Sequence, residues 1–296
     1  MSSFRLPARA LLLRLWPALL LCLAGCERKT PEYRSIEKYD GVIRPVKIGT
    51  EQNLDRIHFS LDTPDEFPVT VTVRAQLENM RGDRPLPYTR SSRGARGKPL
   101  FQLFRIDGSR SGSYQWQWGW RCGEAKARHD DDVVYRLPWA SGDSHEMTQG
   151  YNGSHTHQGD SRYAYDFDMR EGTEVLAARA GVVCRVEYHS TAGGYDPKFE
   201  NEANYIAVVH DDGTVAMYGH LREYGAIVTP GIRVRTGQVI GYSGNTGFSN
   251  GAHLHFHVAR ALDGFTQETL PIRMATDAGI LPALEEGEDY EAVDTP

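Results

Sequence analysis

Short segments of alternating apolar and polar residues, separated by glycine-containing turns, recur along this chain between residues 42 and 262. Residues 69–73 read Val-Thr-Val-Thr-Val, and a period of two is typical of a half-buried strand. After residue 25 no long stretch shows the 3.6-residue period of an amphipathic helix. The chain is therefore predicted to be all-β and antiparallel. In its second half the predicted strands are 163–169, 174–177, 181–188, 205–210, 215–220, 238–242 and 253–259.

The same pattern predicts five segments. They are a leader (1–25), a polar tether (26–41), a smaller N-terminal β domain (42–136), a second β domain (137–262) and an acidic C-terminal tail (263–296). The tail is expected to be mobile surface because acidic residues crowd its end. The N-terminal β domain holds only His58 and His129 and no metal-type spacing, so the chemistry is expected in the second domain.

The N-terminal segment has the layout of an export signal. Arg5, Arg9 and Arg14 form a basic head, and an apolar run follows at 11–23. That run is too short to span a bilayer comfortably as a helix, which takes about 20 residues. Leu-Ala-Gly-Cys at 23–26 resembles the bacterial lipobox, which implies cleavage before Cys26 and a lipid on its thiol. A plain signal peptide with an incidental cysteine, or a retained anchor, is the alternative.

The net charge restricts the classes of binding partner that the chain is expected to have. The formal net charge is −6 at pH 7, and loss of the leader arginines makes the remainder more negative. Nucleic acid is not expected as a partner, because its binding calls for a basic surface.

Beyond the leader and the lipobox only Cys122 and Cys184 remain. In an oxidising compartment they either pair or stay as buried thiols.

Trp116, Trp118 and Trp120 alternate along a predicted strand and therefore share one face. A row of tryptophans can bind sugar rings, or it can form the packed inner face of a β domain. The sequence leaves both interpretations open and favours packing.

Nine of the eleven histidines fall in the second β domain, which indicates a metal site. Residues 253–257 read His-Leu-His-Phe-His. On a strand the three imidazoles project to one side, while Leu254 and Phe256 project to the other and can enter a core. A catalytic zinc ion takes three nitrogen or oxygen ligands and keeps an open position for water. This strand is therefore expected to supply part of a zinc site.

Glycine-rich motifs precede the histidine strand. Gly-Tyr-Ser-Gly-Asn-Thr-Gly at 241–247 is followed by Gly-Ala-His-Leu-His-Phe at 251–256, and further motifs lie upstream at 172–183, 209–214, 218–221 and 231–240. In this order the motifs resemble those of lysostaphin-like (LytM) zinc metallo-endopeptidases. The resemblance covers about residues 150–260 and implies an antiparallel β-sheet peptidase domain that binds Zn²⁺. It does not extend to residues 27–135.

The resemblance also implies the zinc ligands. His255, the second histidine of His-Leu-His, would be one. The family's other ligands are a histidine and an aspartate that usually lie four residues apart. This sequence departs from that spacing, because His157 and Asp166 are nine residues apart. We predict His157, Asp166 and His255 as the ligands. The rivals are His155 for the histidine, and Asp160 or Asp168 for the aspartate.

His220 and His253 match the family's non-ligand histidines and are predicted to be catalytic. One would accept the proton of the zinc-bound water, and the other would donate to the developing oxyanion. Zinc lowers the pKa of its bound water to about 7, where imidazoles transfer protons well. His257 is expected to support a ligand rather than react, and His145 and His210 are expected to be structural.

Together these inferences predict an exported, lipid-anchored zinc endopeptidase that hydrolyses amide bonds in the peptide cross-bridges of peptidoglycan. Glu27 after Cys26 favours the periplasmic face of the outer membrane. The expected partners are peptidoglycan, the membrane through the lipid on Cys26, and cell-wall enzymes or regulators. The N-terminal β domain would be a spacer, a wall-binding module or a regulator. The alternatives are a catalytically inactive activator of a cell-wall amidase and a metallopeptidase that acts on protein.

Overall fold

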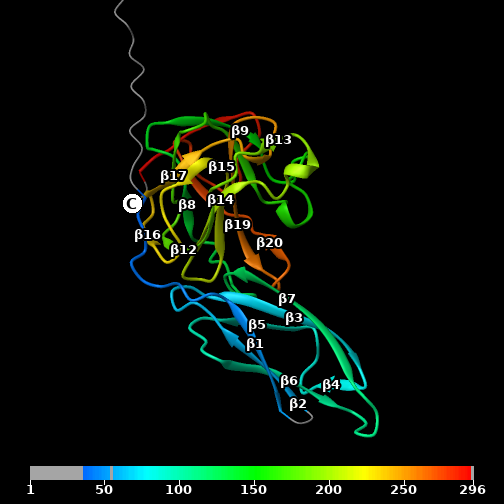
Figure 1. Ribbon diagram of the computed structural model, residues 1–296. Helices are drawn as coiled ribbons and strands as arrows, with labels where there is room; N and C mark the ends of the chain where they lie inside the picture. The colour runs from blue at the N-terminus through cyan, green and yellow to red at the C-terminus, as the bar shows by residue number, and fades with distance from the viewer. Residues whose placement is uncertain (1–35, 54–55, 295–296) are drawn as a thin grey trace, which may run out of the picture. The chain divides into compact units, whose positions relative to one another are not determined.

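The computed structural model describes residues 36–53 and 56–294 (Figure 1). These residues form β-strands and two short 3-10 turns, η1 (Gly159–Ser161) and η2 (Pro197–Phe199), so the all-β prediction is confirmed. Within the described residues, no helical segment has the length and apolar character that crossing a bilayer requires. The predicted leader and lipobox, and the tether up to residue 35, lie outside the described residues.

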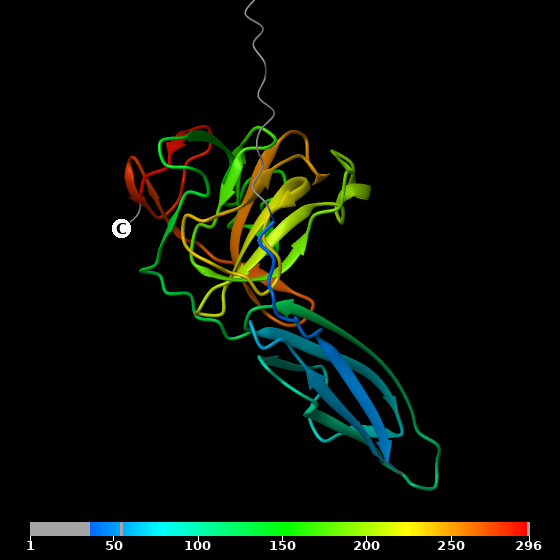
Figure 2. The same ribbon diagram turned by 60° about the vertical axis from the view of Figure 1, so that its left-hand side comes forward.

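Residues 47–122 form two antiparallel sheets, blue to green in Figure 2. One has the order β1 (Lys47–Asn53), β2 (Arg56–Asp62), β6 (Lys98–Arg105) and β4 (Met80–Gly82). The other has the order β5 (Tyr88–Ser92), β3 (Val69–Glu78) and β7 (Ser113–Cys122). Phe59, Val71 and Leu103 belong to one buried cluster between them. Residues 69–73 of β3, predicted to be half-buried, are covered on both faces. Thr72 is buried as well and accepts a 2.8 Å hydrogen bond from Gly264 N.

The large sheet holds the predicted site. Its main path runs through β16 (Arg233–Val234), β12 (Gly181–Glu187), β14 (Asn204–Val209), β15 (Val215–Ala226), β19 (His253–Ala261), β10 (Tyr165–Asp168), β9 (Ser144–Gln149) and β23 (Asp289–Glu291). To this path are added β11 (Glu174–Leu176), β17 (Val239–Ser243) and β20 (Gln267–Thr269). Leu254 and Phe256 of β19 are fully buried in the main apolar cluster, as the alternating pattern predicted. The intervening histidines therefore line the other face.

The C-terminal segment is part of the fold, and the prediction that it forms a mobile tail is wrong. Residues 273–281 form β21 (Arg273–Thr276) and β22 (Gly279–Leu281), and β21 pairs in parallel with β8 (Val134–Arg136). β23 pairs with β9 at the edge of the large sheet. The physical reason is that Ile272, Met274 and Tyr290 are spaced between the acidic residues and enter the main apolar cluster. Acidic composition describes only the side chains that remain at the surface.

A disulfide between Cys122 and Cys184 joins the end of β7 to β12, which answers the question that the sequence left open. Around it, Val182, Ala207 and Val209 of the large sheet belong to the same buried cluster as the N-terminal sheets. Arg121 adds hydrogen bonds of 2.9 Å to Gln267 Oε1 and to Phe265 O. The N-terminal sheets and the large sheet thus share covalent, apolar and polar contacts.

Candidate metal centre and catalytic groove

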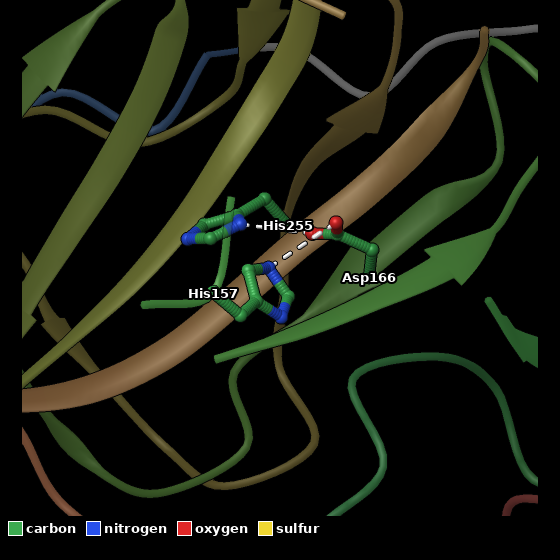
Figure 3. A group of neighbouring side chains, drawn as sticks. All are labelled: His157, Asp166 and His255. Carbon is green, nitrogen blue, oxygen red and sulfur yellow. Dashed lines mark hydrogen bonds and ion pairs between the residues drawn. The ribbon is translucent and has the colours of Figure 1, made fainter. Parts of the chain in front are cut away.

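The three predicted ligands come together at the junction of β10 and β19. Asp166 and His255 are direct cross-strand partners, and His157 enters from the loop between β9 and η1 (Figure 3). His255 Nδ1 lies 2.9 Å from Asp166 Oδ1, and His157 Nε2 lies 3.2 Å from Asp166 Oδ2. One ligand atom from each residue lies within 4.8 Å of the others. Among the described residues this is the only His, Cys, Asp or Glu cluster of three close enough to hold a metal ion.

Two contacts from the end of β9 hold the triad in place. His157 Nδ1 lies 3.0 Å from Gly150 O, so Nδ1–H donates to that carbonyl and leaves Nε2 free as a ligand atom. Gln149 Nε2 donates to Asp166 Oδ2 at 2.7 Å. Gln149 Oε1 also accepts from the backbone N–H groups of His155 and Thr156, both at 3.1 Å, and so shapes the loop that carries His157. Sequence analysis missed Gln149, which nothing in its local pattern marks.

The chemistry of this cluster fits a zinc ion. Two imidazoles and one carboxylate form the donor set of a catalytic site that keeps an open position. His157 Nε2 is buried and has no well-aligned hydrogen-bond partner within the described residues. Burial alone would raise the pKa of Asp166, but the contacts with His157 and His255 outweigh burial and hold that pKa well below its usual range. Asp166 is therefore ionised, and a cation would pair its charge.

The rival ligands lie apart from this cluster. His155 and Asp160 are exposed, with Asp160 inside η1. Asp168 is an exposed residue at the end of β10 and pairs in register with His253. Each is a plausible ligand by spacing alone, but none joins the group made by His157, Asp166 and His255.

His220 and His253 lie beside the triad, with ring centroids 4.5 Å apart. His253 Nδ1 contacts Gly251 O at 2.8 Å, and its Nε2 lies 3.8 Å from Asp166 Oδ1. His220 Nδ1 contacts Thr246 O at 2.7 Å. In both rings Nδ1–H donates to a carbonyl, so Nε2 carries the free lone pair. Burial, followed by the neighbouring His253, lowers the pKa of His220 to about 3, which keeps this imidazole neutral.

The backbone explains how His220 reaches the site. β15 pairs with β19 up to Gly219 and with β17 from Leu221 onward. His220 stands at this change of partner with a φ of +58°, in the left-handed region that few non-glycine residues adopt. Backbone outliers of this kind cost of order 1–3 kcal/mol and persist where the surrounding structure holds them. Here the strain turns the imidazole toward His253 and His255.

His257 supports the triad from behind. Its Nδ1 lies 2.9 Å from His255 Nε2, and its Nε2 lies 3.4 Å from Gln267 Nε2. Gln267 in turn accepts from Arg121 of β7. Burial, and then the neighbouring His255, lower the pKa of His257 well below its usual value. This neutral imidazole fits the supporting position expected for it. His210 is buried and bonded to Thr214, and His145 contacts Asp168 O.

The site opens into a cavity of about 500 Å³ whose lining includes Asp166, His220, His253 and His255. The segment of residues 190–204 forms part of the wall. Its β13 (Gly193–Gly194) pairs in parallel with β18 (Gly247–Phe248). The Tyr195 ring stacks on Phe248 with centroids 4.9 Å apart, and both residues line the cavity. The cavity therefore has both an aromatic pair and the histidines in its wall.

Comparison with known proteins agrees with this geometry. Residues 160–267 match the family described as Peptidase family M23. The chain is 36% identical over 112 residues to the glycyl-glycine endopeptidase ALE-1 of Staphylococcus capitis, and the aligned region covers 38% of this chain and 27% of that protein. It is 35% identical to lysostaphin of Staphylococcus simulans, over 38% of this chain and 20% of that protein. It is 37% identical to the peptidoglycan DD-endopeptidase ShyA of Vibrio cholerae, over 31% of this chain and 19% of that protein.

The chain thus spans about a fifth to a quarter of the length of these relatives. The matched range contains Asp166, His220, His253 and His255, and His157 lies three residues before it. Residues 160–267 are therefore similar to peptidase family M23, and the complete His-Asp-His triad lies in and directly before this segment.

Proposed function

We propose that this protein is a zinc-dependent endopeptidase that hydrolyses amide bonds in the peptide cross-bridges of peptidoglycan. The observation that carries the proposal is the complete triad of His157, Asp166 and His255 with two further imidazoles beside it in one cavity. The names of the relatives, a glycyl-glycine endopeptidase and a peptidoglycan DD-endopeptidase among them, support this class of substrate.

His157, Asp166 and His255 would hold the zinc ion. When bound, zinc polarises the scissile carbonyl and lowers the pKa of water so that hydroxide is available near neutral pH. The protein's own part is proton transfer and orientation. His253 and His220 each have Nδ1 tied to a backbone carbonyl, which aims Nε2 for proton transfer. In this proposal one ring accepts the proton of the attacking water at its free Nε2. The other ring, once its own Nε2 has taken up a proton, donates to the oxygen on which charge develops.

A catalytically inactive amidase activator is the second candidate. Loss of a ligand would favour it, but the described residues retain every donor of the triad. Asp166 and His255 also line the cavity, so a substrate has access to the centre. Both observations favour the enzyme.

Export and anchoring through a lipid on Cys26 remain part of the proposal and rest on the leader and lipobox sequence. A protein that acts on cell wall has to leave the cytoplasm, which agrees with such a leader. Cys26→Ala should abolish incorporation of labelled fatty acid and move the protein out of the detergent phase. Unchanged partitioning would point to an ordinary membrane anchor.

The central test measures zinc content and digestion of intact sacculi on the same preparations. His255→Ala should lose most of its zinc and all of its activity, while His155→Ala should keep its zinc. His58→Gln on β2 is the control for a histidine change far from the site. Full activity of His255→Ala at normal zinc content would disprove the assignment. A zinc-loaded wild type that leaves sacculi intact, but stimulates an amidase, would support the alternative.

A further inference from the structure

A second cavity, of about 560 Å³, lies between β7 and the strands of the large sheet. Four aromatic residues line it: Trp118 and Trp120 of β7, Tyr205 of β14, and Phe265. Arg121, Arg185 and Arg260 also line it. Arg185 pairs with Glu187 and Arg260 with Glu268, but no Asp or Glu is among the described residues of the wall itself. The chain carries a net charge of −6, so an aromatic and cationic cavity without a carboxylate in its wall differs from the rest of the protein in the ligands that it can bind.

Arg121 lacks an anionic partner in this cavity. Its two terminal nitrogens donate to neutral acceptors, Gln267 Oε1 and Phe265 O, each at 2.9 Å. Its Nε is buried and has no hydrogen-bond partner, and no ion pair joins it to a carboxylate of the described residues. Because an incompletely paired charge is costly to desolvate, such a guanidinium favours a ligand that offers further oxygen acceptors. Burial also lowers the pKa of Arg121.

The aromatic walls are held rigidly. The disulfide fixes the end of β7 to β12, and β7 pairs with β3 along its whole length. Arg185 lies over the rings of both Trp120 and Tyr205, at 5.9 and 5.7 Å. Rigid aromatic faces with adjacent guanidinium groups suit flat or ring-shaped ligands that also carry polar or anionic groups.

The aromatic cavity adjoins the catalytic cavity, because the two share a lining residue. Met217 of β15 lines both cavities. A third hollow between them shares Arg185 and Tyr205 with the aromatic cavity, and shares Glu200 and Ala203 with the catalytic one. A long ligand that reaches the triad can therefore extend across Met217 to the tryptophans.

We propose that this aromatic cavity is a subsite for the glycan strand of the substrate. The inference rests on the proposed function and adds to it: the peptide bridge enters the catalytic cavity while the attached sugars occupy the aromatic cavity. Pyranose rings offer apolar faces for the aromatic side chains, and the carbonyl oxygens of the acetamido groups of amino sugars offer acceptors for Arg121 and Arg185. The tryptophan row would then have two roles, because Trp116, Trp118 and Trp120 all pack against the buried N-terminal cluster, and Trp118 and Trp120 also line the cavity.

The test uses the full mature protein and two defined probes: glycan strands stripped of peptide, and a short cross-linked peptide without sugar. The wild type should bind the glycan strands in a calorimetric titration. Trp118→Ala and Arg185→Gln should each weaken that binding about tenfold, as expected for loss of one stacked or charged contact. Trp116→Ala, on the same face of the same strand but outside the cavity, and Arg56→Gln on β2 should leave glycan binding unchanged.

Kinetics separate this proposal from the proposed function. Trp118→Ala should raise KM for sacculi, and the factor of this rise should be about ten times the factor for the short peptide. The value of kcat should not fall to match. Absence of glycan binding by the wild type, or binding of the peptide probe alone, would overturn the subsite. Equal loss in Trp116→Ala and Trp118→Ala would reduce the effect to folding and would also overturn it. A wild type that binds glycan but cuts neither sacculi nor peptide would instead refute the proposed function and leave the subsite standing.

Discussion

Replacement of Gln149 by alanine should weaken both the fold and zinc binding. Gln149 is 7% exposed and lies opposite Asp166 in the β9–β10 pair. Its side chain makes four contacts: to Asp166 Oδ2, to Thr156 Oγ1, and from the backbone N–H groups of His155 and Thr156. It therefore orients a ligand and also holds the loop that carries another ligand.

The magnitude follows from these contacts. A hydrogen bond to a charged group contributes about 1.5–3 kcal/mol, and each neutral one contributes about 0.5–1.5 kcal/mol. The cavity admits water, which can replace part of what is lost. We therefore expect Gln149→Ala to lower the free energy of unfolding of the metal-free protein by about 3 kcal/mol. Loss of a hydrogen bond that orients a ligand should weaken zinc binding by about 10–100-fold.

The assay combines urea unfolding of chelator-treated protein with zinc titration against a competing chelator. Gln158→Ala is the matched control, because Gln158 lies in the same loop but is exposed, and its side chain donates to Ser154 O, away from the triad. It should change stability by less than about 0.5 kcal/mol. Gln149→Glu is roughly isosteric but places a carboxylate beside Asp166 Oδ2, so the metal-free variant should lose stability relative to wild type as the pH rises and both carboxylates ionise. Normal zinc affinity in Gln149→Ala would refute the orienting role.

Three further predictions concern catalysis, covalent structure and pH. His220→Ala and His253→Ala should keep zinc, as metal analysis would show, yet lose turnover; loss of zinc in either would overturn the division between ligands and proton carriers. Removal of the Cys122–Cys184 bond, which closes a loop with a sequence separation of 62, should cost about 4 kcal/mol in urea unfolding under oxidising conditions, and a cost near zero would contradict its role as a clamp. Burial lowers the pKa of His210 from an ordinary 6.5 to about 3, so the unfolded chain binds a proton over that range while the folded chain does not. Stability should therefore be full above pH 6.5 and fall as the pH drops toward 3, by up to about 1.4 kcal/mol per pH unit, and melting curves of His210→Asn should show a shallower slope.

The local pattern of the sequence was sufficient where the structure depends on neighbouring residues. The alternation at 253–257 determined which side chains of β19 enter the core and which line the site, because successive residues on a strand point to opposite faces. The glycine-rich turns likewise indicated antiparallel strands. The acidic composition of residues 263–296 led to the wrong prediction of a mobile tail. The apolar residues Ile272, Met274 and Tyr290 in this segment are buried beside β9 and β8.

Choices between residues of the same type needed tertiary structure. By spacing, His155 and His157 differ by two residues, and Asp160, Asp166 and Asp168 all follow within reach. The pairing of β10 with β19 sets Asp166 against His255, and the Gly150 carbonyl turns His157 toward both. The pairing of Cys122 with Cys184 and the contact of Arg121 with Gln267 also join residues far apart in the chain. A sequence determines by itself the features that repeat locally, such as strands and their faces. The meeting of distant side chains depends on sheet register and packing, which only the folded chain establishes.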